Sequence, residues 1–276
     1  MAATNALSEV VFRIRRFDPA ANASPRWEEH RLPYTLGMTV LDGLKKLKET
    51  VAPGLAWRSS CRMGVCGSCG MFINGRARLA CNTQITELGT NVVMVAPLPN
   101  FDTIRDLVPD LVPMFDAHQA LMPYIIRGDH DEMTLPTGEF GQSAHELEQF
   151  LQFSYCIRCG CCMAACPTYA TDPRYSGPMP LTQSHRYNAD TRDDGFTARR
   201  TVLAGEAGPW RCHYAGECSR VCPKGVDPAK AIQLMKRELV LDYLRLRRER
   251  CPAEIAARPA GIKRRDGIPE APKPTI

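Results

Sequence analysis

Most of the 13 cysteines in this chain of 276 residues lie in three short stretches, and thiolates are strong metal ligands. The stretches span residues 61–81, 156–166 and 212–222. Residues 1–9 are short, carry Glu9 and run directly into a strand-like segment, so they do not resemble a secretory signal. Without an export signal, these cysteines are better explained as metal ligands than as disulfide partners.

The first stretch has a spacing of four and then two residues between its first three cysteines, followed by a fourth cysteine. This is the plant-type ferredoxin pattern, which holds a [2Fe-2S] cluster. Glycine stands at 64, 67 and 70, where the chain must wrap closely around inorganic sulfide. A zinc site with four cysteines is the alternative, but such sites usually pair two short knuckles. We therefore predict a [2Fe-2S] centre on Cys61, Cys66, Cys69 and Cys81.

The second and third stretches are two versions of one pattern. The second follows the two-cluster ferredoxin spacing and ends in Cys166-Pro167. The third repeats that spacing and ends in Cys222-Pro223, but Ala215 stands where the middle cysteine is expected. A cluster at this position would lack one thiolate.

In two-cluster ferredoxins the cysteine before the proline ligates the other cluster. This rule predicts a [4Fe-4S] centre with four thiolates and a [3Fe-4S] centre with three. Two cysteines remain: Cys161 is expected to be a small buried side chain beside a cluster, and Cys251 a residue at a helix end. The predicted ligand sets are Cys156, Cys159, Cys162 and Cys222 for the four-iron centre, and Cys166, Cys212 and Cys218 for the three-iron centre.

The elements that position the first stretch are predicted to be strands with one helix. Alternating side chains predict strands over residues 10–17 and 27–34, and Thr39 with Asp42 forms a capping-box start for a helix. A hairpin turned by Asn74-Gly75 returns Cys81 toward the other cysteines, and a last strand follows at 92–95. Residues 1–100 are therefore expected to form a ferredoxin-like β-grasp domain.

The other two stretches are predicted to lie among helices. A Ser143 and Glu146 capping box starts a helix that leads to Cys156, and Asp227-Pro228 starts another that runs to about residue 248. We predict an α+β fold: an N-terminal plant-type ferredoxin (β-grasp) domain plus a C-terminal all-α bacterial-ferredoxin-like domain. The expected boundaries are 1–100 for the first domain, 101–142 for a linker with some helix, 143–250 for the helical domain, and 251–276 for an extended tail without its own core.

The charge pattern limits the kinds of partner that the chain is expected to bind. Its formal charge is +5, from 35 basic and 30 acidic side chains, and basic residues concentrate at 245–250 and 263–265. These are either a solvated helix face and tail or a patch that faces anionic lipid or an acidic partner. Nucleic acid is disfavoured because no stacking aromatics are interleaved with the charges. No apolar run approaches the roughly 18 residues that would span a bilayer.

At these motifs the chain closely resembles the iron–sulfur subunit of succinate dehydrogenase and fumarate reductase, the respiratory complex II family. The resemblance covers roughly residues 10–244. It is carried by Ser60-Cys61-Arg62 through Cys66-Gly67-Ser68-Cys69, by the run from Cys156 to Pro167, and by Arg211-Cys212-His213 through Cys222-Pro223-Lys224-Gly225.

Membership in this family implies an electron-transfer subunit of a membrane-bound succinate:quinone oxidoreductase, or of a quinol:fumarate reductase that works in reverse. The implied partners are a flavoprotein subunit with FAD, which carries the dicarboxylate chemistry, and a membrane anchor with quinone and often haem b. Electrons would pass singly from flavin through the two-iron, four-iron and three-iron centres to quinone. The implied location is the cytoplasmic face of a bacterial cell membrane, where the anchor holds this peripheral subunit.

The resemblance also implies quinone contacts near the three-iron centre, at Pro167, His213 and Lys236. A protonated lysine or imidazole near a quinone oxygen would stabilise negative charge on it. Two of these residues also have a purely structural interpretation. His213 would then only hydrogen-bond near the cluster, and Lys236 would be a solvated helix residue.

Two departures from the family pattern bear on function. Relatives that use ubiquinone tend to carry a tryptophan pair shortly after the Cys-Pro, whereas this chain has Tyr169-Ala170, so menaquinone is favoured. Met63 stands where relatives commonly carry an acidic residue, and loss of that charge should raise the potential of the two-iron centre.

Two other interpretations remain open from sequence alone. One is a zinc-stabilised binding module with a basic tail, which would contain zinc and no acid-labile sulfide. The other is an iron–sulfur subunit of a different oxidoreductase, such as a thiol-linked fumarate reductase or a glycolate-oxidase-type complex. Those relatives often add cysteine-rich domains that this chain lacks.

Overall fold

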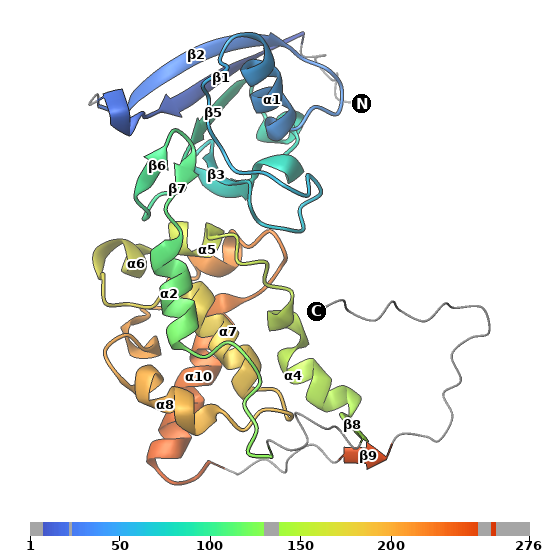
Figure 1. Cartoon of the computed structure of the whole chain (residues 1–276), viewed down its shortest axis with the longest axis vertical. Helices are drawn as coiled ribbons and strands as arrows, with labels where there is room; N and C mark the ends of the chain where they lie inside the picture. The colour runs from blue at the N-terminus through green and yellow to red at the C-terminus, as the bar shows by residue number, and fades with distance from the viewer. Residues whose placement is uncertain (1–7, 22–23, 130–137, 248–254, 258–276) are drawn as a thin grey trace, which may run out of the picture.

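The computed structural model describes residues 8–21, 24–129, 138–247 and 255–257. Figure 1 shows a sheet unit above a helical unit, with α5 (Cys161–Ala164) and α6 (Pro167–Thr171) at the junction between them. The helix α10 (Pro228–Tyr243) runs through the lower unit, away from that junction.

The upper unit is a mixed sheet of five strands in the order β2-β1-β5-β3-β4. Strands β1 and β5 are parallel and all other neighbours are antiparallel. The predicted hairpin is confirmed, because Asn74 and Gly75 both have positive φ between β3 and β4. The strand bounds are β1 Glu9–Arg16, β2 Arg26–Pro33, β3 Gly70–Ile73, β4 Arg76–Leu79 and β5 Val92–Ala96.

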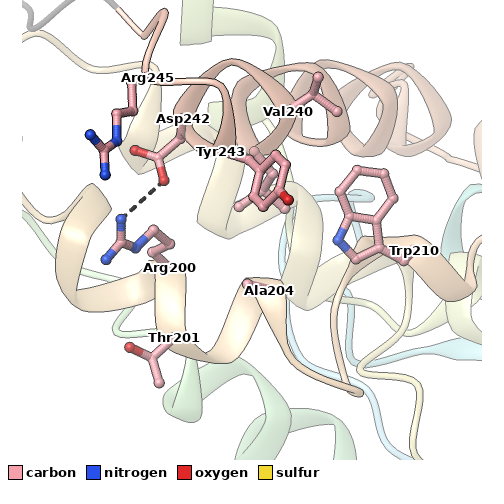
Figure 2. Close-up of a pocket in the computed structure, with 9 residues that line it drawn as sticks. Arg200, Thr201, Ala204, Trp210, Val240, Asp242, Tyr243 and Arg245 are labelled. Carbon is pink, nitrogen blue, oxygen red and sulfur yellow. Dashed lines mark hydrogen bonds and ion pairs between the residues drawn. The ribbon is translucent and has the colours of Figure 1, made fainter.

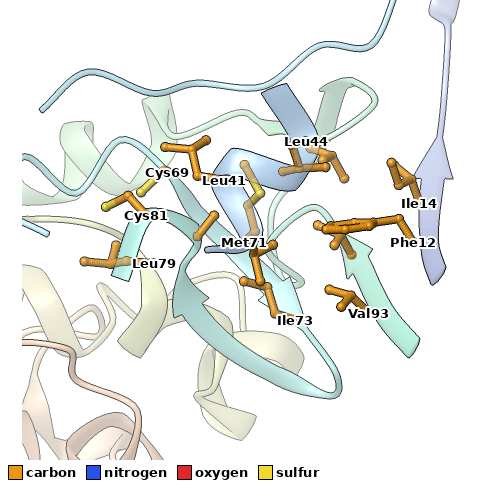
Figure 3. Packing of buried hydrophobic residues seen from close by; sticks show 14 of the residues in the cluster. Phe12, Ile14, Leu41, Leu44, Cys69, Met71, Ile73, Leu79, Cys81 and Val93 are labelled. Carbon is orange, nitrogen blue, oxygen red and sulfur yellow. The ribbon is translucent and has the colours of Figure 1, made fainter. Parts of the chain in front are cut away.

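One face of this sheet is covered by α1 (Val40–Thr50). The predicted capping box is present, since the Asp42 amide donates to Thr39 Oγ1 over 3.2 Å and Asp42 Oδ2 accepts from the Thr39 amide over 3.0 Å. The ring of Phe12 packs so closely on α1 that a Cβ at Gly43 would lie 2.1 Å from it. Figure 3 shows Cys69 and Cys81 at the end of this core away from Phe12.

A connecting region holds the strands β6 (Thr103–Arg105) and β7 (Val108–Pro109) and the helix α2 (Val112–Ala120). Asp106, which is 2% exposed, fastens this region to the sheet unit. Its carboxylate accepts hydrogen bonds from the Phe17 amide over 3.0 Å and the Ala56 amide over 2.9 Å, and forms a 3.0 Å ion pair with Arg16.

The lower unit is built from helices around an apolar core that includes Leu181, Leu203, Ile232 and Met235. The capping box predicted at Ser143 is confirmed at the start of α4. The helix bounds are α4 Ala144–Ser154, α7 Pro178–Asn188, α8 Phe196–Ala204 and α9 Glu217–Arg220, beside α5, α6 and α10, with the 3₁₀ turn η4 at Pro209–Arg211.

The helix predicted to run from Asp227 to about residue 248 is shorter in the structure. It begins as predicted, because Asp227 Oδ1 accepts from the Lys230 amide over 3.0 Å. It ends at Tyr243, and Arg245 then adopts a left-handed φ of 56°, which stops a right-handed helix. The segment expected to be an extended tail contains β9 (Ile255–Ala257), which pairs with β8 (Gly138–Phe140) in antiparallel fashion.

Helix α8 is held in place by a fully buried arginine. Arg199 forms hydrogen bonds of 2.6 and 2.9 Å with the two carboxylate oxygens of Asp193. It also donates to the carbonyls of Met122 and Tyr124 after α2. The guanidinium therefore fixes α8 to the connecting region through charge-assisted hydrogen bonds.

The two units share one core at their junction. Cys161 and Ala164 of α5 pack with the buried residues of the sheet unit. The amide of Asn100 donates to the carbonyls of Met163, Ala164 and Cys166 at 3.1, 3.0 and 3.3 Å. This one side chain therefore joins the end of α5 and the residue before α6 to the sheet unit.

Candidate iron–sulfur centres

The first cysteine loop wraps so that backbone N–H groups face its sulfurs. The Gly64 amide donates to Cys81 Sγ over 3.2 Å, and the Cys66 and Val65 amides donate to Cys61 Sγ over 3.2 and 3.3 Å. Gly64 has a φ of 70°, which brings its amide toward the sulfur and which L-residues adopt at a cost. The loop thus presents several donors to a site that would carry negative charge.

Two cysteines of this loop differ in the ease with which they ionise. Hydrogen bonding from the Ser68 side chain, followed by contacts with Cys61, lowers the pKa of Cys66 to about 6. Burial raises the pKa of Cys69 to about 12, and the neighbouring Cys81 contributes to this rise. A bound metal ligates the thiolate form, so a positively charged iron centre would favour ionisation of both.

Four thiols from two separate runs line one pocket, which we call the four-thiol pocket. Its thiols are those of Cys156, Cys159, Cys162 and Cys222, and Ile157 and Val226 supply apolar walls. Burial raises the pKa of Cys156 to about 11 and raises that of Cys162 well above the usual thiol value. The structure therefore brings together the set predicted for the four-iron centre.

A second pocket, the three-thiol pocket, is lined by the other cysteines of the same two runs. They are Cys166, Cys212 and Cys218, and Ala215 lies in the wall beside them. The Tyr214 amide faces Cys212 Sγ over 3.4 Å, and the Tyr169 amide faces Cys166 Sγ over 3.5 Å. The structure also brings together the set predicted for the three-iron centre.

The two runs have the same local backbone. In the first, Arg158 and Gly160 have positive φ of 53° and 80°, and the four-residue helix α5 follows. In the second, Tyr214 and Gly216 have positive φ of 60° and 75°, and the four-residue helix α9 follows. Ala215 thus occupies the place that Cys159 has in the first run.

The first cysteine loop touches the loop of the four-thiol pocket. A Cβ at Gly67 would lie 2.8 Å from the Ile157 carbonyl oxygen and 2.9 Å from Cys159 Cβ. A Cβ at Gly70 would lie 2.8 Å from the Cys159 carbonyl oxygen. Only glycine permits this approach, so the two predicted centres are adjacent.

The cysteines line pockets and do not converge on the position of one metal ion. Within the described residues, no three or more His, Cys, Asp or Glu side chains converge as the ligands of a single metal ion do. The 12 cysteines that the structure describes are all free. Pockets lined by four and three thiols, with amides directed at the sulfurs, fit polynuclear iron–sulfur clusters.

Comparisons with known proteins agree with this arrangement. Residues 11–116 match the 2Fe-2S iron-sulfur cluster binding domain, and residues 152–226 match the 4Fe-4S dicluster domain. The fumarate reductase iron-sulfur subunit of Mycobacterium tuberculosis is 44% identical over 230 residues, which cover 83% of this chain and 92% of that protein. The chain belongs to the iron–sulfur subunits of succinate dehydrogenase and fumarate reductase.

Some other relatives of this iron–sulfur subunit are named as fumarate reductase subunits and some as succinate dehydrogenase subunits. The succinate dehydrogenase iron-sulfur subunit of Paracoccus denitrificans is 36% identical, over 83% of this chain and 87% of that protein. A solved chain of the Mycobacterium smegmatis Sdh1 complex in the apo form superposes with a TM-score of 0.73 at 27% identity, over 86% of this chain and 98% of that one. The predicted fold class is therefore confirmed, as is the predicted family.

The residues predicted to contact quinone lie around the three-thiol pocket of the iron–sulfur subunit. Pro167 lines the pocket, and Lys236 Nζ donates to the Cys212 carbonyl over 2.9 Å. His213 is exposed next to Cys212. Tyr169 is half-buried and packs against Phe101, with ring centroids 5.9 Å apart.

Several other residues of the subunit can be placed. Cys161 is fully buried, as expected, and Met63 is 71% exposed, whereas Cys251 lies outside the described residues. The contacts of Asn100 with the end of α5 were not predicted from the sequence, which indicated only that the first domain ends near this residue. Among the described residues no helix is long and apolar enough to cross a membrane.

Proposed function

We propose that this iron–sulfur subunit carries single electrons between a flavoprotein and a quinone through [2Fe-2S], [4Fe-4S] and [3Fe-4S] centres. The observation that carries the proposal is the continuity of the cysteine loops. The first loop contacts the loop of the four-thiol pocket at Gly67 and Gly70. The four-thiol and three-thiol pockets are both lined by cysteines of the same two runs. Each proposed centre is therefore held by a loop that is joined to, or touches, the loop of the next one.

The chain's own residues would hold the clusters, and the clusters, when bound, supply one-electron chemistry. Cys61, Cys66, Cys69 and Cys81 would hold the two-iron cluster. The four-thiol pocket fits a cubane, and the three-thiol pocket fits a cubane that lacks one iron, because Ala215 offers no thiolate. Amides at Gly64, Val65 and Cys66 donate toward sulfur, which favours the more negative, reduced form.

The three-thiol pocket would be the end that faces quinone. Lys236 supports this assignment, because its ammonium group lies against the backbone of a predicted ligand, Cys212. A cation here favours uptake of an electron at the pocket and negative charge on a nearby quinone oxygen. Pro167 lines the pocket and the exposed His213 directly follows Cys212, and both belong to the proposed quinone surroundings.

The partners follow from family membership. We propose a flavoprotein subunit with FAD at the two-iron end, and a membrane anchor with quinone and haem b at the three-iron end. The subunit would then be peripheral to the cytoplasmic face of the cell membrane. Tyr169, which takes the place of an indole donor, favours menaquinone as the quinone.

Electron paramagnetic resonance of the native complex tests the three centres. The air-oxidised complex should show a three-iron signal, and stepwise reduction should reveal the two-iron and four-iron signals. Iron and acid-labile sulfide should both be present. Zinc without sulfide would support the binding-module alternative, and the absence of a three-iron signal would remove the assignment at Ala215.

Direction and quinone type need a second experiment. Succinate oxidation and fumarate reduction should be compared in the same preparation, each with menaquinone and ubiquinone analogues. We expect the higher ratio of turnover rate to quinone KM with the menaquinone analogue in both directions. A preference for ubiquinone would show that Tyr169 does not determine the choice.

A further inference from the structure

A groove of about 800 Å³ opens on the surface between α8 and α10. This volume lies within the range of small-molecule sites. Figure 2 shows that its two ends differ: Arg200, Asp242 and Arg245 lie at one end, and Trp210 lies at the other beside Tyr243 and Val240. The groove is therefore amphipathic along its length.

At the apolar end, several large aromatic and aliphatic side chains are exposed to solvent side by side. Tyr243 is 86% exposed, Trp210 49% and Val240 43%, and Leu244 directly after α10 is 53% exposed. Exposed apolar side chains that gather in one place mark a contact with another molecule or a membrane. Trp and Tyr are the aromatic residues enriched at the boundary between lipid and water.

The charged end is rich in arginine. Arg200 lies 3.1 Å from Asp242, so this carboxylate offsets one of the two guanidinium charges in the groove. Arg245 adds the second, so the charged side chains that line the groove are two arginines and one aspartate, with a net positive charge. Positive charge next to exposed aromatics is typical of surfaces attracted to anionic lipid.

The groove is connected to the three-thiol pocket. Trp210 stands two residues before Cys212. Lys236, Val240 and Tyr243 follow one face of α10 at spacings of four and three residues, so this face leads from the Cys212 carbonyl to the groove. The apolar side of the groove therefore begins near Cys212, at Trp210, and extends along α10 away from the three-thiol pocket, whose lining includes Ala229 and Ile232 near the start of that helix.

We propose that the groove between α8 and α10 binds an anionic phospholipid of the membrane surface. The phosphate would lie at Arg200 and Arg245, and the acyl chains would lie along Tyr243, Val240 and Trp210. A phospholipid carries a negative phosphate and apolar acyl chains in one molecule. The phosphate matches the arginine end of the groove, and the acyl chains match the apolar end. The inference goes beyond the electron route and rests on the proposed function only for the end that faces the membrane.

Vesicle co-sedimentation of the cluster-loaded full chain tests the proposal. Vesicles of phosphatidylcholine with phosphatidylglycerol should bind the chain, and vesicles of phosphatidylcholine alone should bind it much more weakly. The double variant Arg200→Gln/Arg245→Gln should bind the anionic vesicles on the order of tenfold more weakly. Tyr243→Ala, at a side chain that is already exposed, should weaken binding to both kinds of vesicle.

A matched control is available on the sheet unit. Arg13→Gln/Arg31→Gln removes the same charge from two exposed arginines of β1 and β2 and should leave vesicle binding unchanged. The proposal is overturned if the chain does not bind vesicles, or if the control weakens binding as much as the groove variant does. It is also overturned if the groove variant binds vesicles normally but loses the anchor subunit on purification, since the occupant would then be protein. Cluster signals are recorded in parallel, so failure of the electron route would be seen separately.

Discussion

The four-thiol and three-thiol pockets have the same local backbone but different surroundings. Each run has two residues of positive φ followed by a helix of four residues. At the four-thiol pocket, the residue between the positive-φ positions is Cys159, whose backbone is covered by Gly67 and Gly70 of the sheet unit. At the three-thiol pocket it is Ala215, which is exposed.

This difference indicates that the loop shape does not depend on the fourth thiol. Glycine at 160 and at 216 adopts the left-handed conformation in both runs and starts both short helices. The chain can therefore lose a ligand at Ala215 without losing the fold, and only the predicted cluster type changes. The pocket whose loop touches the sheet unit keeps four thiols, and the pocket whose loop carries the exposed Ala215 has three.

The largest expected effect comes from removing a thiol of the four-thiol pocket. Cys162→Ala should abolish the four-iron signal, and electron transfer from succinate to quinone should fall to background, because cluster binding is coupled to folding. Cys161→Ala is the matched control at the next position. It should keep all three signals and cost about 1 kcal/mol of unfolding free energy for the small cavity. Equal cluster contents in the two variants would refute the ligand assignment.

Supplying the missing thiol should make the two pockets alike. Ala215→Cys places a thiol at the position equivalent to Cys159, so the three-iron signal of the oxidised complex should give way to a four-iron signal on reduction. Ala215→Val changes the size of the side chain without adding a ligand and should keep the three-iron signal. A fully loaded Ala215→Cys protein with an unchanged three-iron signal would show that the two loops are not equivalent.

The thiol sets could be predicted from the sequence because the spacing within each run is local, and because the cysteine before each proline is known to serve the other cluster. Other contacts between distant segments could not be predicted. The role of Asn100 depends on where α5 docks, and the pairing of β8 with β9 joins segments more than 100 residues apart. The end of α10 was also placed too late, because no glycine or proline marks Tyr243 and the left-handed turn falls on Arg245.

The contact between the first loop and the four-thiol loop can be tested at glycine. Gly67 and Gly75 share a φ of 78°, so alanine at either should cost about 1 kcal/mol of unfolding free energy in backbone strain. Only at Gly67 would the new methyl group also collide with Ile157 and Cys159, for a total of about 2–3 kcal/mol. Gly67→Ala should also slow reoxidation of the two-iron centre in a single-turnover experiment. Identical behaviour of the two variants would mean that the electron route does not use this contact.

The smallest expected effect is an acid sensitivity on the side of the four-thiol pocket. His118 of α2 is buried, and burial, followed by the charge of Arg158, lowers its pKa from 6.5 to about 4. A histidine with a depressed pKa is neutral in the folded protein, so its contribution is complete above pH 6.5 and is lost as the pH falls toward 4. Between pH 6.5 and 5.5 the free energy of unfolding should drop by about 1 kcal/mol through this group.

The variant His118→Gln should remove that part of the pH dependence, as measured by chemical denaturation of the cluster-loaded chain at each pH. His145→Gln, at an exposed position of α4, is the control and should retain it. Protonation of His118 would bury a positive charge close to that of Arg158, which lies between Cys156 and Cys159, and burial and repulsion both oppose this. Because Met114 of α2 packs against Cys162, we expect acid to weaken the four-thiol side of the molecule before the three-thiol side. Loss of the three-iron signal first, on acidification, would contradict this order.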